Sequence, residues 1–570
     1  MMNMKNSKRK YYWIGALLSI IIISGCSKNF LDRPPIDSIV DVNFYKTDDQ
    51  VLASTALLYS KVWFDYNDKA SFNIGDFRAG TVFSAWNYRD NVLFNTTGNT
   101  GANGDSWRSF FIVVGQSNLA IVNINKYAGV AVTPKVKKIA IAEARFMRAL
   151  AYRYLVMNWG EVPVITNNMT ILSDTSISRN TAPSIWKFIT NEMRAVVADL
   201  PETPIRAGRL TKWSAEGMLA RFYLTRAGVE ANGAGPRNQM FLDSAKYYAE
   251  DVIKNSKAAL LTKYSNLFLF PYDNNSESLF SLQWAYSPGA YGTQNTAPSY
   301  LAYSPDIANG DGWGGDVGAT WWMMTQYEGI IALNDTVLKG NTIDARLHAT
   351  FMMPGTRYPE ITQTLGAVKQ KLIFPFAGTD VNSLSIKKYI TGKAEDVGGQ
   401  SARQNYGNDT YMMRLAEMYL IYAEATLGNS ASTTDAKALE YFNKIHMRAG
   451  LPEYKLSSTG AVLPLTADVI FKERIVEFAM EGMAWYDLVS LHYYNKAKAY
   501  SILNSQDRGL FFTKPDLFPD PNYWTFTKTV WARTDRKINA NDGNFLLPIP
   551  TTELSQAPNL RKPAVDYYNK

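Results

Sequence analysis

The chain has 570 residues, with 59 lysines and arginines against 51 aspartates and glutamates, and a formal net charge of +8. This excess is too small and too dispersed to indicate a nucleic-acid-binding protein. One cysteine and three histidines exclude zinc sites built from cysteine and leave little for a Ser-His or Cys-His nucleophile. We predict no cofactor and no metal site, and we name no catalytic residue.

The N-terminal segment is typical of an exported, lipid-anchored protein. Basic residues precede an apolar run over 11–23, and Ser24-Gly25-Cys26 follows it. A basic start, an apolar run and small residues before a cut describe an export signal, and small residues directly before cysteine resemble a lipobox. The run is shorter than the roughly 20 residues that a transmembrane helix needs. We therefore expect cleavage after residue 25 and lipid attachment at Cys26.

Helical signals occupy the first half of the chain and return near its end. Thr47 and Gln50 form a capping-box pattern, and Pro134 begins a helix with apolar residues at i+4 steps that stops at Gly160. Further helices are expected over 107–127, 182–200, 211–227, 238–255, 410–427, 435–449 and 468–483. Helix pairs joined by short turns are typical of tetratricopeptide-type arrays. We predict a mainly α fold built as a right-handed helical array of this kind.

Residues 256–408 have a different character, because turn-forming Gly, Asn, Asp and Pro dominate and only short apolar runs lie between them. Residues 70–104 look similar. Long irregular stretches inside a compact domain are usually functional. We expect the longer one to be a loop and short-strand insertion that carries the ligand site.

Aromatic residues within these irregular stretches are the candidate binding residues. A sugar ring needs a flat exposed aromatic side chain together with polar groups for its hydroxyls. The candidates are Arg78, Trp86, Asn87, Tyr88, Tyr291, Tyr303, Trp313 and Trp321. Trp313 lies between two glycines and has no local core to join, whereas Trp321 begins an apolar run and is also a core candidate. Oxygen side chains over 309–316 could ligate calcium, but their spacing is not that of an EF-hand.

Three carboxylates near the C-terminus require a separate interpretation. Glu473, Glu477 and Glu481 recur at i+4 steps and so share one face of an expected helix. Carboxylates placed in this way can be mistaken for a glycosidase pair. Neighbouring cations such as Arg474 favour a structural role as ion-pair partners instead.

The chain resembles the SusD/RagB family of Bacteroidetes outer-membrane lipoproteins over nearly all of its mature length. The clearest motif is Ala142-Glu-Ala-Arg-Phe-Met-Arg-Ala-Leu-Ala-Tyr152, followed by Asn158-Trp-Gly-Glu-Val-Pro163. Further similarity lies at 26–32, 215–224, 413–425, 448–452, 473–482, 485–488 and 546–550. The chain departs from the family at 562–567, where Lys-Pro-Ala-Val-Asp-Tyr replaces the usual Asn-Pro-Gly-Tyr element.

The resemblance implies a domain organisation. After the signal segment 1–25, a single SusD-like domain is expected over 26–570. Its tetratricopeptide-like scaffold would occupy about 40–255 and 409–500, the ligand-binding insertion about 256–408, and a C-terminal tail 500–570. No family motif assigns a ligand role to an individual residue.

The resemblance also implies a function. It implies a lipid-anchored protein of the outer membrane that faces the cell exterior, captures an oligosaccharide without cleaving it and delivers it to a TonB-dependent SusC-like transporter. Some relatives handle peptides, so a peptide or another nutrient is the alternative ligand. A glycoside hydrolase is the less favoured alternative, since the sequence does not exclude two carboxylates facing each other across a cleft.

Overall fold

The computed structural model describes residues 44–569, apart from 85, 87, 174–175, 290, 366, 375–380, 383, 456–460, 517–522 and 530–534. Cys26 and the expected signal segment lie outside this range. In the described part of the chain, no helix combines the length and the apolar character that crossing a membrane requires.

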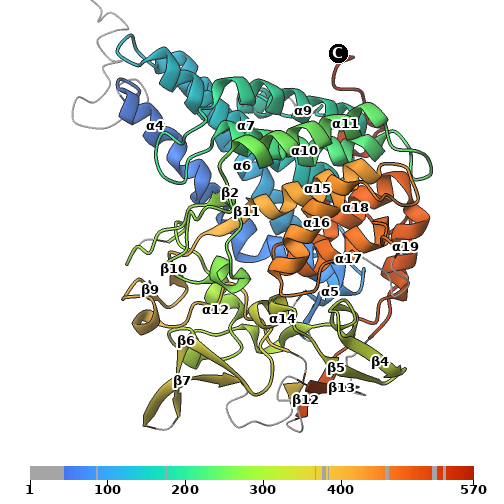
Figure 1. Cartoon of the computed structure of the whole chain (residues 1–570). Coiled ribbons are helices and arrows are strands. Elements are labelled where there is room, and N and C mark those ends of the chain that lie inside the picture. The colour runs from blue at the N-terminus through green and yellow to red at the C-terminus, as the bar shows by residue number, and fades with distance from the viewer. Residues whose placement is uncertain are drawn as a thin grey trace, which may run out of the picture.

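Helices fill the upper part of the view in Figure 1, and strands with short helices fill the lower part. The long helices contact one another in the order α6, α7, α9, α10, α11, α15 and α16, so each covers the next. The expected mainly α, tetratricopeptide-like array is confirmed. The long helices are α4 Asp48–Ala56, α6 Gly101–Tyr127, α7 Pro134–Trp159, α9 Ala182–Asp199, α10 Lys212–Val229, α11 Gln239–Asn255, α15 Leu415–Leu427, α16 Ala436–Arg448, α17 Ala467–Glu477, α18 Ala484–Tyr494 and α19 Lys496–Ser505. The shorter ones are α5 Arg89–Val92, α8 Asn168–Ser173, α12 Ala297–Leu301, α13 Trp321–Met324, α14 Ala345–Thr350 and α20 Thr551–Gln556.

Local capping explains where the helices begin and end. The Thr47 side chain accepts a hydrogen bond from Gln50 N–H, and the Gln50 side chain accepts one from Thr47 N–H, so both halves of the capping box are present. Helix α7 has Thr133 as its N-cap and ends at Gly160, whose φ of 73° suits glycine.

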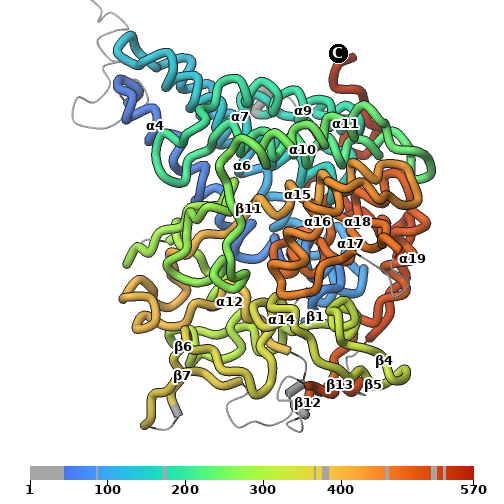
Figure 2. Tube along the Cα trace, viewed as in Figure 1, coloured from blue at the N-terminus to red at the C-terminus, as the bar shows by residue number. Residues whose placement is uncertain are grey.

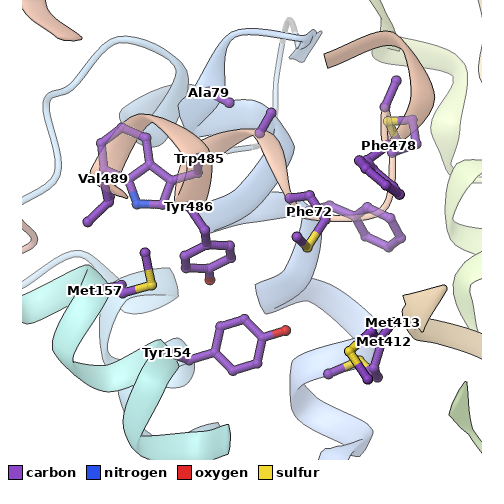
Figure 3. Packing of buried hydrophobic residues seen from close by; sticks show 14 of the residues in the cluster. Phe72, Ala79, Tyr154, Met157, Met412, Met413, Phe478, Trp485, Tyr486 and Val489 are labelled. Carbon is purple, nitrogen blue, oxygen red and sulfur yellow. The ribbon is translucent and has the colours of Figure 1, made fainter. Parts of the chain in front are cut away.

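The core is continuous between the first and the last helices. The rings of Tyr154 of α7 and Tyr486 of α18 lie next to each other in Figure 3, and their centroids are 5.0 Å apart. On the same helices, Trp485 Nε1–H donates to the side-chain oxygen of Asn158 at 3.1 Å. Helix α18 also contacts α10 and the helical turn over Phe72–Phe77, so the C-terminal helices, orange in Figure 2, pack against earlier parts of the chain.

The strands form small antiparallel sheets. The pairs are β1 Val82–Ser84 with β3 Val317–Ala319, β2 Ser278–Leu282 with β11 Thr410–Arg414, β6 Thr356–Leu365 with β7 Val368–Phe374, and β9 Ser401–Ala402 with β10 Asn405–Tyr406. A five-stranded sheet has the order β4 Ile330–Asn334, β5 Val337–Asn341, β13 Tyr523–Lys528, β12 Phe511–Asp516 and β8 Val381–Asn382. The C-terminal segment thus contributes two strands to a sheet of the middle segment.

Three segments differ from the helices and loops expected from sequence. Residues 410–414 form strand β11, because their backbone pairs with that of β2 before α15 begins. Helix α17 ends at Glu477, and Met480 adopts a positive φ of 64°. Residues Tyr66–Ala70 and Phe72–Phe77 form wide π-helical turns. Part of the stretch expected as a loop is therefore helical and buried.

Candidate functional site

The pairing of β1 with β3 brings the two aromatic-rich stretches together. Val82 lies opposite Ala319 and Ser84 opposite Val317, so the segment after β1 reaches the segment before β3. A second link comes from the bridge between Asn295 and Tyr406. Segments more than 200 residues apart thereby meet at one place on the surface.

A cavity of about 320 Å³ lies at this meeting point. Its volume is at the lower end of the range for small-molecule sites. The lining residues come from a π-helical turn, the loop after β1, helix α12 and the segment before it, the turn that leads into β3, and the β9–β10 turn. They are Asp68, Lys69, Tyr88, Tyr291, Thr296, Ser299, Tyr300, Trp313, Asp316, Val317 and Gln404.

Two exposed rings and two supported ones surround the cavity. Tyr291 is 67% exposed and Trp313 is 60% exposed, so both offer a ring to a ligand. Tyr88 stacks on Phe77 with centroids 5.2 Å apart and an interplanar angle of 16°, and Tyr300 meets Tyr88 edge to face at 5.9 Å. These ring contacts hold Tyr88 and Tyr300 in a fixed orientation.

The exposure of Trp313 follows from its glycine neighbours. A Cβ atom at Gly314 would lie 2.2 Å from the carbonyl oxygen of Leu301, and one at Gly312 would lie 2.4 Å from Ser304. Glycine on both sides lets the backbone press against the segment that begins with α12, and Trp313 N–H donates to the Ser299 carbonyl at 3.0 Å. The backbone is therefore anchored while the indole ring points away from the core.

Polar groups form the remainder of the rim. Thr296 Oγ1–H donates to Asp68 Oδ1 at 2.5 Å, and Gln404 N–H donates to Ser299 Oγ at 3.2 Å. Lys69 is more than half exposed beside Asp68. Burial, together with the carboxylates of Asp68 and Asp316, raises the pKa of Tyr88. Its phenol therefore remains a neutral donor and acceptor at physiological pH.

The structure places Trp86 next to the cavity and leaves Tyr303 out of the cavity lining. Trp86 is 59% exposed, and its backbone N–H donates to Asp316, a cavity residue. Tyr303 packs edge to face against Phe374 at 5.0 Å and does not line the cavity. Asn87 lies outside the described residues.

Arg78 and Trp321 lie in the core, and we leave both out of the site. Arg78 donates to the carbonyls of Asn544 and Phe545, its guanidinium lies 4.2 Å from the centroid of Phe94, and burial lowers its pKa to about 9. Trp321 is 6% exposed and meets Phe511 edge to face. Arg78 stands in a stretch expected to be irregular, but tertiary packing covers it, whereas Trp321 begins the apolar run that makes it a core candidate.

Sequence reasoning missed Asp68, Lys69, Thr296 and Gln404. Asp68 and Lys69 follow an aromatic residue in a stretch with no sugar-binding signal of its own, and Gln404 reaches the cavity only through the β9–β10 turn. Trp313 could be recognised as a candidate from its glycine neighbours in sequence. These polar residues reach the cavity only through pairing between segments that are far apart in the chain.

The three glutamates near the C-terminus belong to a buried ion-pair network, as the structural interpretation predicts. Arg414 pairs with Glu477 at 2.9 Å and with Glu481 at 2.7 Å, and Arg346 pairs with Glu473 at 2.6 Å. Glu481 lies beyond the end of α17, so the three do not share one helix. In the ranges that the structure describes, no group of three or more His, Cys, Asp or Glu is placed to hold a metal ion.

The chain is similar to known proteins over nearly its whole length. Residues 276–567 match the model described as the SusD family, and residues 29–224 match one described as starch-binding associating with outer membrane. A SusD-like protein of Bacteroides ovatus is 34% identical, covering 96% of each chain. A crystal structure described as one with xylogluco-oligosaccharide has 33% identity and a TM-score of 0.77, covering 91% of this chain and 99% of that one. The starch-binding protein SusD of Bacteroides thetaiotaomicron is 27% identical, covering 61% of this chain and 63% of its own.

Proposed function

Because the chain belongs to the SusD family, we propose that it is a cell-surface lipoprotein that binds an oligosaccharide and delivers it, uncleaved, to a TonB-dependent SusC-like transporter. The proposed binding site is the cavity around Tyr88, Tyr291 and Trp313, with Trp86 at its edge. Cys26 is the proposed site of lipid attachment.

The observation that carries the proposal is the combination of exposed rings with a hydroxyl-recognising rim. Tyr291 and Trp313 present apolar faces that match the CH faces of sugar rings, and Asp68, Thr296 and Gln404 offer hydrogen-bonding groups beside them. An open site of this size supports binding of a few sugar units. Its affinity is expected to be modest, because association costs must be met first.

The carboxylates at the cavity fit a binding role. Asp68 accepts the hydroxyl hydrogen of Thr296, and Asp316 accepts hydrogen bonds from Ser84 Oγ and Trp86 N–H. Each carboxylate thus positions a wall of the cavity. We propose that neither acts as an acid or nucleophile on the sugar.

A glycan array, run beside a peptide array with residues 27–570, tests the proposal. Xyloglucan oligosaccharides are the first probes, because a relative's crystal structure is described as one with such a ligand. We expect binding to one class of oligosaccharide, with no new reducing ends after prolonged incubation. Reducing-sugar release by the purified chain, or binding to peptides alone, would contradict it.

A further inference from the structure

A second cavity of about 300 Å³ lies in the helical half, between α10, α15, α17 and α18. It shares no lining residue with the aromatic cavity. Its walls are both charged and apolar, the apolar part including Phe471, Leu491 and Ile502. The oligosaccharide site does not explain this cavity.

Most charges around it are paired. Arg221 Nε–H donates to Glu417 at 2.9 Å, Arg474 Nε–H donates to Asp487 at 2.9 Å, and Arg237 donates to Glu424 at 2.8 Å. At the rim, Lys498 pairs with Asp468 at 3.0 Å. Each carboxylate that lines the cavity therefore already has its own cation.

Arg153 is the lining cation that remains once these ion pairs are counted. It comes from α7, is 2% exposed and lines the cavity. Its guanidinium lies 4.8 Å from the ring centroid of Tyr486 and 5.2 Å from that of Tyr154. Its Nε and Nη1 atoms have no hydrogen-bond partner among the described residues. A buried charge without a partner is costly, and buried N–H donors are normally satisfied.

Two other lining arginines also have an unsatisfied donor. The Nη1 atom of Arg474 and the Nε atom of Arg237 have no hydrogen-bond partner in the described part of the chain. The cavity therefore has one positive charge in excess and unsatisfied guanidinium donors on three of its arginines. Arginine presents its donors in a planar fork that suits a carboxylate.

We propose that this cavity binds a small organic monoanion, whose carboxylate pairs with Arg153. One negative charge would balance the excess cation, and the apolar body of the ligand would lie against Phe471, Leu491 and Ile502. The volume suits a ligand at the small end of the range for such sites.

The test is isothermal titration of residues 27–570, which retain every described residue, with monocarboxylates from acetate to benzoate. Each acid is compared with its neutral amide, and chloride and phosphate are run at equal ionic strength. We expect one site per chain for at least one carboxylate, no binding of its amide, and a small rise in Tm on saturation. Binding of none of the carboxylates, or equal binding of chloride or phosphate, would overturn the proposal.

Two substitutions assign the site. Arg153→Met removes the unpaired charge while keeping an unbranched apolar stem, and it should weaken carboxylate binding at least tenfold. Arg153→Lys keeps the charge and should retain part of the affinity. Arg194→Met, at an exposed position on α9, is the matched control and should leave binding unchanged. Unaltered carboxylate affinity in Arg153→Met, or in Arg153→Lys if the first variant fails to fold, would overturn the assignment.

Discussion

The Oδ2 atom of Asp316 accepts a hydrogen bond from the backbone N–H of Trp86 at 3.1 Å, across 230 residues of sequence. The same oxygen accepts the hydroxyl hydrogen of Ser84 at 2.6 Å. Asp316 immediately precedes β3, and Ser84 ends β1. The Asp316 side chain therefore links the two strands once more, in addition to their backbone pairing. It thereby holds the Trp86 segment against the cavity.

Replacing Asp316 with Ala should release this segment. We expect an oligosaccharide affinity roughly five times lower, since loss of positioning hydrogen bonds costs about 1 kcal/mol. Isothermal titration measures the effect. Asp335→Ala, at an exposed turn between β4 and β5, should bind as the parent does. Equal affinity of Asp316→Ala and Asp335→Ala would show that the Trp86 segment needs no such attachment.

Gly314→Ala should disturb the position of Trp313. Its Cβ atom would meet the Leu301 carbonyl oxygen at 2.2 Å, so the backbone must shift. We expect a loss of about 1–3 kcal/mol in the free energy of unfolding, together with weaker ligand binding. Gly104→Ala is the matched control, because its Cβ would meet nothing within 4 Å in helix α6. Urea unfolding should show Gly104→Ala at least as stable as the parent, and a Gly314→Ala variant of parental stability would contradict the close approach.

Glu477 should make the protein sensitive to acid. Burial opposes its ionisation, but Arg448, Arg414 and Arg346 outweigh burial and lower its pKa from 4.5 to about 2. The unfolded chain therefore takes up this proton at higher pH than the folded one. The stabilisation, on the order of 3 kcal/mol, is complete above about pH 5 and is lost as pH falls from 4.5 toward 2.

Glu477→Gln should unfold at lower urea concentration at pH 7 and lose less stability between pH 5 and pH 3 than the parent. The neutral amide leaves buried arginines without their counter-charge, which costs several kcal/mol. Glu440→Gln alters a carboxylate that is 58% exposed and should preserve the parental pH profile. A parental slope in Glu477→Gln would show that its carboxylate does not contribute to acid unfolding.

Cys26→Ala should prevent lipid attachment while leaving the folded domain intact. We expect the variant to lose incorporation of labelled fatty acid and to leave the outer-membrane fraction. Ser27→Ala, next to the proposed attachment site, should be labelled normally. Continued fatty-acid labelling of Cys26→Ala would remove Cys26 as the anchor.

Much of the helical half could be predicted from sequence because its signals are local. Thr47 and Gln50 act within one turn, and the Pro134 start and Gly160 stop of α7 need no distant partner. The strand over 410–414 could not be predicted in this way, since its conformation depends on pairing with β2.

The candidate site was only partly predictable for the same reason. Trp313 could be identified because its glycine neighbours are adjacent in sequence. Asp68 and Gln404 reach the cavity through contacts with residues far along the chain, which no local pattern reports. Arg78 shows the opposite case, a polar residue in irregular sequence that distant carbonyls bury.

Binding of the selected oligosaccharide to the Tyr291→Ala/Trp313→Ala double variant, measured by isothermal titration, tests the central claim most directly. The control is Tyr247→Ala, since Tyr247 is 63% exposed and lies on α11, away from the cavity. We predict an affinity at least tenfold lower in the double variant, with an unchanged unfolding transition, and parental affinity in the control. Parental affinity in the double variant would contradict the account.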